Sequence, residues 1–404
     1  MMNKVCGIIT EYNPFHNGHA YHLAESRRAT GAEDVIAVMS GDFVQRGEPA
    51  IIDKYRRAQM ALGCGVDIVL ELPVVWATAS AEGFADGACR LLAATNIVNA
   101  VCFGSEAGEI APLMDIARHL CSETADFKDV LKKQLATGAS FPAARGLAVA
   151  ATLGEAAADI LNHPNNILGI EYLKSILKND LKIMPHTIRR RGAAHNSGEF
   201  FGDTASAGAI RRHVLSGGEV AQLLPLMPGD SFWVLAGEHR DGAINYLDNF
   251  SPYFHHALFL TPKERLADFS GLPTSMQNRL VAAAREHFLI SDVLAAAKSK
   301  SFTHTALQRA VLRIVLGIRA DAITQDIPYI RVLGFRRKKE ALLRRLHAAA
   351  SVPVITNLKH THNLPKNARN LLDLEISATR AYWLGLKPYG VPEKNEFAAP
   401  MVIL

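Results

Sequence analysis

The sequence contains few cysteines, and they form no metal-binding or disulfide pattern. The 404 residues include five, Cys6, Cys64, Cys89, Cys102 and Cys121, which are widely spaced. There is no CxxC pair and no Cys/His cluster with the spacing of zinc ligands. A disulfide-stapled or zinc-bound fold is therefore not expected, and we predict that the five thiols are reduced, buried and inert.

Long apolar runs and long polar tracts are also missing. No apolar run approaches the roughly 20 residues that a helix needs to span a bilayer. The first apolar segment reaches Thr10 and Glu11 almost at once, so it is typical of a strand rather than of a signal peptide. We therefore predict no membrane association and a cytoplasmic location. With 49% hydrophobic and 21% charged residues, the chain should fold into two or three globular domains.

Four short runs rich in β-branched and apolar residues come early in the chain, and each is typical of a strand buried on both faces. They are Val5–Thr10, Val35–Met39, Asp67–Leu72 and Ala100–Phe103. Segments with helical periodicity separate them, such as Ala20–Ala29 and Lys54–Leu62, the second with Asp53 as its expected N-cap. Alternation of strand and helix predicts an α/β fold with a parallel sheet.

The later part of the chain is predicted to be mostly helical. Helical periodicity covers about 115–161 and 167–177, a strand is expected at 182–188, and a helix begins near Ser206. Beyond about residue 216 the strand signal fades, and Ala, Leu, Lys and Arg dominate at helical spacing. We predict an α/β domain over residues 1–215 and a mainly helical, basic domain over residues 216–404.

Polar or Gly/Pro-containing loops follow the four predicted strands. They are Glu11–His19, Ser40–Pro49, Glu71–Pro73 and Gly104–Glu106. Because the carboxyl ends of parallel strands meet at one edge of a sheet, where such folds bind ligands, we expect these loops to converge there.

Two histidines in the first of these loops, His16 and His19, have the spacing expected of a phosphate site at a helix start. Free amides at a helix N-terminus attract an anion, and imidazoles can donate hydrogen bonds to its oxygens as charge builds during in-line displacement. Gly18 would let a phosphate or flat ring approach the backbone closely. Two surface histidines are the alternative, but the position between a first strand and a helix favours the functional interpretation, and His22 adds a third imidazole.

The segment Gly7–His19 resembles the HxGH signature of the nucleotidylyltransferase superfamily, whose fold is a Rossmann-like parallel α/β sheet. More narrowly, the chain is similar to the bacterial tRNA(Met) cytidine acetate ligases. The supporting segments are Met39–Pro49, Phe103–Glu106, Pro164–Gly169 and Pro328–Gly334. The resemblance implies an enzyme that activates acetate with ATP to give acetyl-adenylate and pyrophosphate. The acetyl group would then pass to N4 of the wobble cytidine of elongator tRNA(Met), forming N4-acetylcytidine.

The resemblance also implies which residues hold ATP, with His16 and His19 as the catalytic pair. The ATP-binding set is Ile9, Thr10, Glu11, Tyr12, Asn13, Pro14, Phe15, His16, Asn17, Gly18, His19, Ala20, Tyr21, His22, Gly104, Asn165, Arg190 and Arg191. Their chemistry is suitable, since Asn165 can both donate and accept and Arg190 carries a donor fork. Each also has a simpler interpretation: Gly104 as a strand end, Asn165 as a helix cap, and the arginines as a solvated basic run.

Other candidates are weaker. A second superfamily motif like ISSTxIR corresponds here to Ala205–Arg211, where Ser206 and Arg211 fit but Ala207 and Gly208 replace the hydroxyl residues. In the loop after the second strand, Asp42, Gln45 and Arg46 either shape the acetate and cytidine pocket or belong to an ordinary connection. Magnesium is expected to accompany ATP. Glu11 could hold it or orient a histidine, and its role stays open.

A basic run in the predicted helical domain points to nucleic acid. Between residues 331 and 345 there is a local excess of six positive charges, and we expect RNA contacts from Arg331, Arg336, Arg337, Lys338 and Lys339. Lys298, Lys300, Arg309 and Arg313 extend the charge upstream. Such a surface neutralises phosphates and binds RNA with strong salt dependence, although a solvated helix face would look the same.

Two other functions fit parts of the sequence. A small-molecule adenylyltransferase explains the histidine motif but leaves the basic half without a role. A non-catalytic RNA-binding protein with a regulatory nucleotide pocket explains the basic half but makes the paired histidines superfluous.

Overall fold

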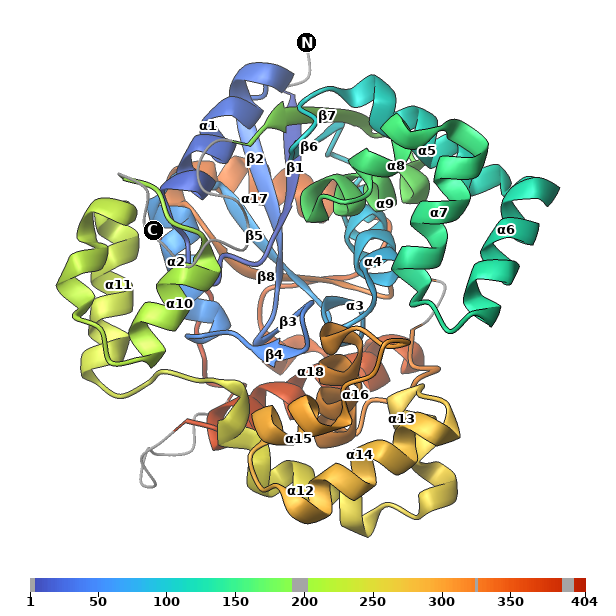
Figure 1. The fold of residues 1–404 in the computed structure, drawn as a ribbon. Helices are drawn as coiled ribbons and strands as arrows, with labels where there is room; N and C mark the ends of the chain where they lie inside the picture. Colours follow the sequence, from blue (N-terminus) through green and yellow to red (C-terminus); the bar gives the residue numbers. More distant parts are fainter. Residues whose placement is uncertain (1–3, 191–202, 324–325, 387–395) are drawn as a thin grey trace.

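The computed structural model describes residues 4–190, 203–323, 326–386 and 396–404 (Figure 1). Five parallel strands form the centre of one sheet in the order β5-β2-β1-β6-β7. Their bounds are β1 Val5–Thr10, β2 Asp34–Ser40, β5 Ile68–Leu72, β6 Ala100–Ser105 and β7 Met184–Arg189. The predicted α/β fold and all five predicted strands are confirmed.

The chain adds strands first on one side of β1 and then on the other. From β1 the chain moves outward through β2 and β5, then returns to pair β6 with the other side of β1. At such a reversal, the loops that follow the two neighbouring strands separate and leave a crevice at the carboxyl edge of the sheet. The loop after β1, which carries His16 and His19, lies at this position.

The central strands bury both faces, as their apolar runs predict. All seven residues of β2 are buried. Ile36 and Val38 belong to one apolar core, while Val35, Ala37 and Met39 belong to a second core on the opposite face. Helices α4 and α9 lie over the first core and helices α1, α2 and α10 over the second. Their bounds are α1 Asn17–Thr30, α2 Lys54–Gly63, α4 Ala81–Ala94, α9 Pro164–Lys178 and α10 Ala207–Leu215.

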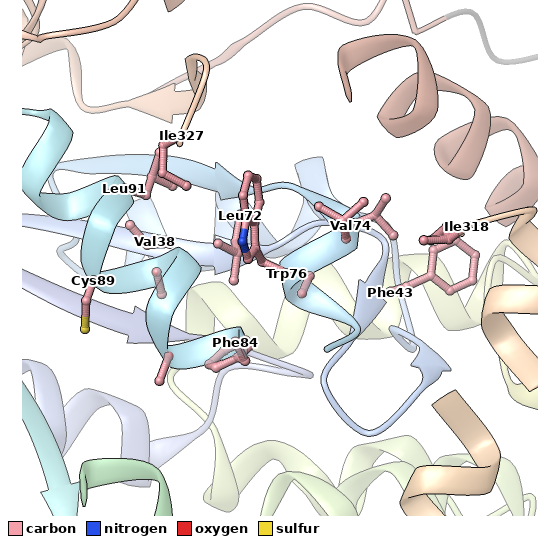
Figure 2. Close-up of a cluster of buried hydrophobic side chains, with 14 of the residues drawn as sticks. Val38, Phe43, Leu72, Val74, Trp76, Phe84, Cys89, Leu91, Ile318 and Ile327 are labelled. Carbon is pink, nitrogen blue, oxygen red and sulfur yellow. The ribbon is translucent and has the colours of Figure 1, made fainter. Parts of the chain in front are cut away.

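The first core continues into the later part of the chain. Figure 2 shows Trp76 close to Leu72, with Phe84, Ile318 and Ile327 farther out in the same cluster. The short helix α3, Val74–Ala77, brings Trp76 there directly after β5. The two halves of the sequence therefore share one continuous apolar interior.

The remaining helices agree with the predicted helical content. Those inserted before β7 are α5 Ile110–Ser122, α6 Ala125–Ala136, α7 Phe141–Leu153 and α8 Glu155–Ile160. Those after α10 are α11 Gly229–Arg240, α12 Ser251–Leu260, α13 Leu266–Ser270, α14 Thr274–Glu286, α15 Ile290–Ala297, α16 His304–Leu316, α17 Glu340–Ala349 and α18 Lys366–Leu384. Short 3-10 turns are η1 Val220–Leu226, η2 Leu247–Phe250, η3 Lys263–Arg265, η4 Arg337–Lys339 and η5 Leu358–His360. None of the described helices is long and apolar enough to cross a membrane.

Three short strands lie beyond residue 216, where the strand signal in the sequence fades. Strand β8, Ile330–Phe335, pairs antiparallel with β5, and β9 (Val354–Ile355) and β10 (Val402–Ile403) both pair with β8. All six residues of β8 are buried. The strand was missed because it is short, stands alone among helices and contains an arginine. Helices α12 to α16 gather beyond the β3–β4 hairpin (Phe43–Val44 and Glu48–Pro49), whereas β8 to β10 extend the sheet of the first half (Figure 1).

The predicted burial of the cysteines holds for three of the five. All five are free, and Cys6, Cys89 and Cys102 are buried, while Cys64 and Cys121 are partly buried. Burial raises the pKa of the Cys6 thiol to about 12 and that of Cys102 to about 11. These thiols stay protonated at neutral pH and are poor nucleophiles.

Candidate nucleotide-binding site at the reversal of the sheet

The two histidines of the first loop build the start of helix α1. His16 is the N-cap, and its Nδ1 accepts the Gly18 amide at 3.0 Å. His19 reaches back, and its Nδ1 accepts the His16 amide at 3.2 Å. This reciprocal arrangement is a capping box made of imidazoles. Because each Nδ1 accepts a hydrogen bond, each neutral ring carries its proton on Nε2, which is left as a donor.

The rings are held in an aromatic cluster. The centroids of His16 and His19 are 3.9 Å apart, and Tyr12 and Phe15 lie 5.0 Å and 5.5 Å from His19. A Cβ at Gly18 would come within 2.8 Å of Cε1 of His16. Glycine at this position therefore makes room for a histidine ring, a role that the sequence alone did not reveal.

His16, His19 and His22 are all neutral at physiological pH. Burial, and then the charge of Arg190, lower the pKa of His16 to about 3 and that of His22 to about 4. Burial and the neighbouring His16 hold the pKa of His19 well below its usual range. Neutral rings with Nε2 hydrogens suit an anionic group, because they donate hydrogen bonds without a proton having to be taken up first.

The loops after β6 and β7 form the opposite side of the site. Nη1 of Arg190 donates to Oδ1 of Asn165 at 3.2 Å, and Nδ2 of Asn165 donates to Oε1 of Glu106 at 2.6 Å. The other oxygen of Glu106 accepts the Asn166 amide at 2.9 Å, so this carboxylate caps helix α9. A Cβ at Gly104 would come within 3.1 Å of Arg190 Cγ. The structure thus joins three predicted residues and adds Glu106 as the group that orients them.

Comparison with known proteins identifies the family. A profile described as HIGH Nucleotidyl Transferase matches residues 2–396. A tRNA(Met) cytidine acetate ligase from Caldanaerobacter subterraneus subsp. tengcongensis is 39% identical over 99% of this chain and 100% of its own length. One from Caldicellulosiruptor saccharolyticus is 40% identical over 96% and 95%. The chain belongs to the tRNA(Met) cytidine acetate ligase family of HIGH nucleotidyl transferases.

Solved structures agree with this assignment. Thermotoga maritima TmcAL without ligand has a TM-score of 0.93, with 35% identity and 99% of each chain covered. The same protein bound with alpha-thio ATP has a TM-score of 0.91, with the same identity and coverage. The resemblance stated from the sequence motifs is confirmed, and so is the Rossmann-like fold that it implied.

In this member of the cytidine acetate ligase family, two predicted residues contact the loop or the helix next to it. Nη1 of Arg211 donates to the Asn13 carbonyl at 2.8 Å, and its Nη2 pairs with Glu48 at 2.8 Å. Ser206 caps α10 by accepting the Ala209 amide at 3.1 Å. Both weaker candidates therefore have clear local partners next to the histidine loop.

The predicted residues Asp42 and Gln45, in the loop after β2, also make local contacts. Asp42 is buried, accepts the Lys54 amide at 2.9 Å, and has its pKa raised to about 6, chiefly by burial. The backbone N–H of Gln45 donates to Oε1 of Glu11 at 2.8 Å. The fully buried Arg57, which sequence reasoning missed, donates to the carbonyls of Glu11 and Ser40. These contacts fix the shape of the loop. Arg46 follows Gln45 and is partly exposed, and Arg191 lies outside the described residues.

The rest of the predicted ATP-binding set lies in or beside the same turn. Ile9 and Thr10 end β1, Pro14 precedes the cap, and Ala20 and Tyr21 are in the first turns of α1. Nδ2 of Asn17 donates to the carbonyls of Asp203 and Pro225 at 2.8 and 2.9 Å. The loop is therefore tied to the segments on both sides of α10.

Few side chains around the histidine loop could act as metal ligands. Within the described ranges, no group of three or more His, Cys, Asp or Glu side chains could hold a metal ion. Burial raises the pKa of Glu11, and one of its oxygens already accepts the Gln45 amide. Glu11 is therefore not part of a cluster of metal ligands within the described ranges.

The prediction of RNA contacts by Arg331 on an exposed surface is wrong. Arg331 is 4% exposed and pairs with Glu71 at 3.0 Å and with Glu396 at 2.7 Å. Lys54 pairs with the same two carboxylates, each at 2.7 Å. The run of charges along the sequence gave no sign that β8 would turn this arginine into the interior.

The other members of the basic run lie at the edge of the sheet opposite the histidines. Phe335 faces Ile68, the first residue of β5, because β8 is antiparallel. Arg336 and Lys339 pair with Asp67 and Asp34 at the amino ends of β5 and β2, whereas Arg337 and Lys338 are exposed. The length of one strand, roughly 20 Å at about 3.3 Å per residue, separates them from the carboxyl edge.

Proposed function

We propose that the chain activates acetate with ATP and transfers the acetyl group to N4 of the wobble cytidine of elongator tRNA(Met). The observation that carries this proposal is the imidazole capping box: His16 and His19 are neutral and present Nε2 donors beside Arg190 at the reversal of the sheet. It occurs in a chain that matches tRNA(Met) cytidine acetate ligases over nearly its whole length. A tRNA acceptor also agrees with the cytoplasmic location predicted from the sequence.

The first step is formation of acetyl-adenylate. A carboxylate oxygen of acetate attacks the α-phosphorus of ATP, and the bond to the β-phosphate oxygen breaks as pyrophosphate leaves. Negative charge accumulates on the non-bridging oxygens of the α-phosphate. The Nε2 hydrogens of His16 and His19 can donate to these oxygens, and Arg190 supplies a positive charge nearby. No proton is transferred in this step, which suits neutral imidazoles.

The second step transfers the acetyl group. The exocyclic amine of cytidine attacks the acetyl carbonyl, AMP leaves with the bonding electrons, and the amine loses one proton. Because an aromatic amine is a weak nucleophile, close positioning must provide much of the acceleration. The base must also leave its stack, which costs least in a single-stranded loop.

Incubation with ATP, radiolabelled acetate and bulk tRNA tests the proposal. We expect label in RNA, recovered as N4-acetylcytidine after nuclease digestion, together with AMP and pyrophosphate in equal amounts. Full ATP binding without label in RNA would refute it. Acetate-independent transfer of AMP to a small phosphorylated metabolite would instead support the adenylyltransferase alternative.

A further inference from the structure

Helix α16 lies directly against the hairpin that follows β2. Gly47, at φ +84°, leaves so little room that a Cβ there would come within 2.5 Å of the Arg309 amide nitrogen. Nε2 of Gln308 donates to Oε2 of Glu48 at 3.4 Å. Figure 1 shows α16 beside β3 and β4, at the end of the molecule toward which the carboxyl edge of the sheet points. Helix and hairpin therefore form one surface.

This surface is linked to the histidine loop. Glu48 accepts from Gln308 through one oxygen and pairs with Arg211 through the other. Arg211 in turn donates to the Asn13 carbonyl, three residues before His16. The side chains of Glu48 and Arg211 therefore connect Gln308 on α16 to the loop that carries the histidines.

Arg309 and Arg313 project from α16 one helical turn apart, and both are only partly exposed. Among the described residues, no ion pair or hydrogen bond joins either guanidinium to an acid, whereas Arg211 and Arg331 are each paired with carboxylates. Burial, and then the charge of Arg313, lower the pKa of Arg309 to about 10. Burial also lowers the pKa of Arg313. Two desolvated like charges without counterions are costly unless an anion binds them.

Phosphate is the anion that this pair fits best. Guanidinium forks bind phosphate oxygens with two parallel hydrogen bonds, and side chains four residues apart on a helix are neighbours. We propose that Arg309 and Arg313 bind backbone phosphates of the RNA next to the nucleotide whose base enters the histidine site. This inference rests on the proposed function for the identity of the RNA. We assign the RNA contact near the reacting base to Arg309 and Arg313 and not to the basic run 336–339, because that run lies at the opposite edge of the sheet.

The test compares two matched double variants. Arg309→Gln with Arg313→Gln removes the two charges, and Lys128→Gln with Lys132→Gln removes two exposed charges at the same spacing on α6, away from the site (Figure 1). Direct binding of an anticodon stem-loop is measured as a function of salt, together with acetate-dependent exchange of pyrophosphate into ATP. We expect the arginine variant to bind the stem-loop at least tenfold more weakly, with a salt slope shallower by about 1.4. The lysine variant should match the wild type.

Three outcomes would overturn the inference. In the first, the arginine variant keeps the stem-loop affinity and the salt slope of the wild type. In the second, the lysine variant loses as much stem-loop affinity as the arginine variant. In the third, the arginine variant loses as much pyrophosphate exchange as RNA binding, which would assign the pair to ATP. Arg309→Lys with Arg313→Lys keeps both charges but not the guanidinium forks, so it should restore the salt slope and part of the affinity. This variant separates a charge effect from misfolding. Absence of acetylation by the wild type, with RNA binding that still depends on the two arginines, would reject the proposed function alone.

Discussion

At the scale of single residues, the site uses histidine where helices usually use Ser, Thr, Asp or Asn. An N-cap side chain satisfies an amide that would otherwise lack a partner. Here the same hydrogen bonds that cap α1 fix the tautomer of His16 and His19, so one local interaction orients both rings and sets which nitrogen donates. Stability and chemistry are therefore coupled at this turn.

Replacement of His19 should separate chemistry from RNA binding. His19→Ala removes one Nε2 donor and should lower the rate of pyrophosphate exchange by about 100-fold or more. His19→Asn keeps an acceptor for the His16 amide and a donor, so it should retain more activity than alanine. Stem-loop affinity should change less than twofold in both. His347→Ala, on the exposed face of α17, is the control. Full exchange activity in His19→Ala would contradict the assignment.

The depressed histidine pKa values predict how stability depends on pH. The folded state keeps His16 and His22 neutral down to pH about 3 and about 4, whereas the unfolded chain binds these protons near pH 6.5. The unfolded state therefore binds more protons, and the free energy of unfolding should fall as pH drops below 6.5. Between pH 6.5 and 5, His22→Gln should reduce this slope by up to about 1.4 kcal/mol per pH unit. Urea unfolding at several pH values measures it, and an unchanged slope would be inconsistent with a buried neutral His22.

At the scale of elements, the site depends on the starts of helices α1, α9 and α10. Each start is held by a side chain near the carboxyl edge of the sheet: His16, Glu106 and Ser206. In the sequence Glu106 is only the last residue of the Phe103–Glu106 motif, but in the fold its carboxylate joins α9 to the loop after β6 and fixes Asn165 beside Arg190. Its importance depends on the adjacency of β6 and β7, which the sequence does not encode locally.

Loss of the Glu106 carboxylate should weaken ATP binding more than catalysis. The Glu106 carboxylate accepts from Nδ2 of Asn165 and from the backbone amides of Asn165 and Asn166. Glu106→Gln replaces one of its two acceptor oxygens with a donor, so Asn165 and Arg190 lose their fixed orientation and α9 loses part of its cap. We expect the KM for ATP to rise about threefold to tenfold with kcat for exchange little changed, and stability to fall by about 1 kcal/mol. Glu109→Gln, three residues later and without a side-chain cap, is the matched control. A kcat effect with an unchanged KM would argue against a positioning role.

The exposed basic residues at the opposite edge lead to a different expectation. Arg337→Gln with Lys338→Gln should leave the KM for an anticodon stem-loop unchanged, because these side chains lie about one strand length from the histidines. Contact with a more distant part of full-length tRNA stays a prediction, and it would raise the KM for full-length tRNA only. A raised KM for the stem-loop would restore the interpretation made from the sequence.

At the scale of the whole molecule, a buried charge cluster joins the late strands to the sheet. Lys54 from α2 and Arg331 from β8 share Glu71 from β5 and Glu396 near the carboxyl end of the chain. All four side chains are at most 5% exposed. Such a cluster specifies which strand pairs with β5, since any other arrangement would leave a charge buried without a partner.

Removal of Arg331 should therefore destabilise the fold rather than affect RNA binding directly. Arg331→Met leaves Glu71 and Glu396 with one cation between them and should lower the free energy of unfolding by about 3 kcal/mol or more. Arg344→Gln breaks an exposed pair with Glu340 and should cost less than about 1 kcal/mol. Denaturant midpoints measure both. If folded Arg331→Met bound RNA tenfold more weakly at unchanged stability, the structural role would be disproved.

The sequence by itself determined the local elements and the chemistry of the first loop. The strands β1, β2, β5, β6 and β7, the cap at Asp53 and the HNGH turn follow from apolar periodicity and turn residues close together in the chain. Only the tertiary structure decided which charges are buried and which edge of the sheet each occupies. A local pattern records neither that β8 runs antiparallel to β5 nor that α16 abuts the hairpin after β2. Those pairings join residues hundreds of positions apart. They turned Arg331 inward, whereas Arg309 and Arg313 have no acidic partner within the part of the chain that the structure describes.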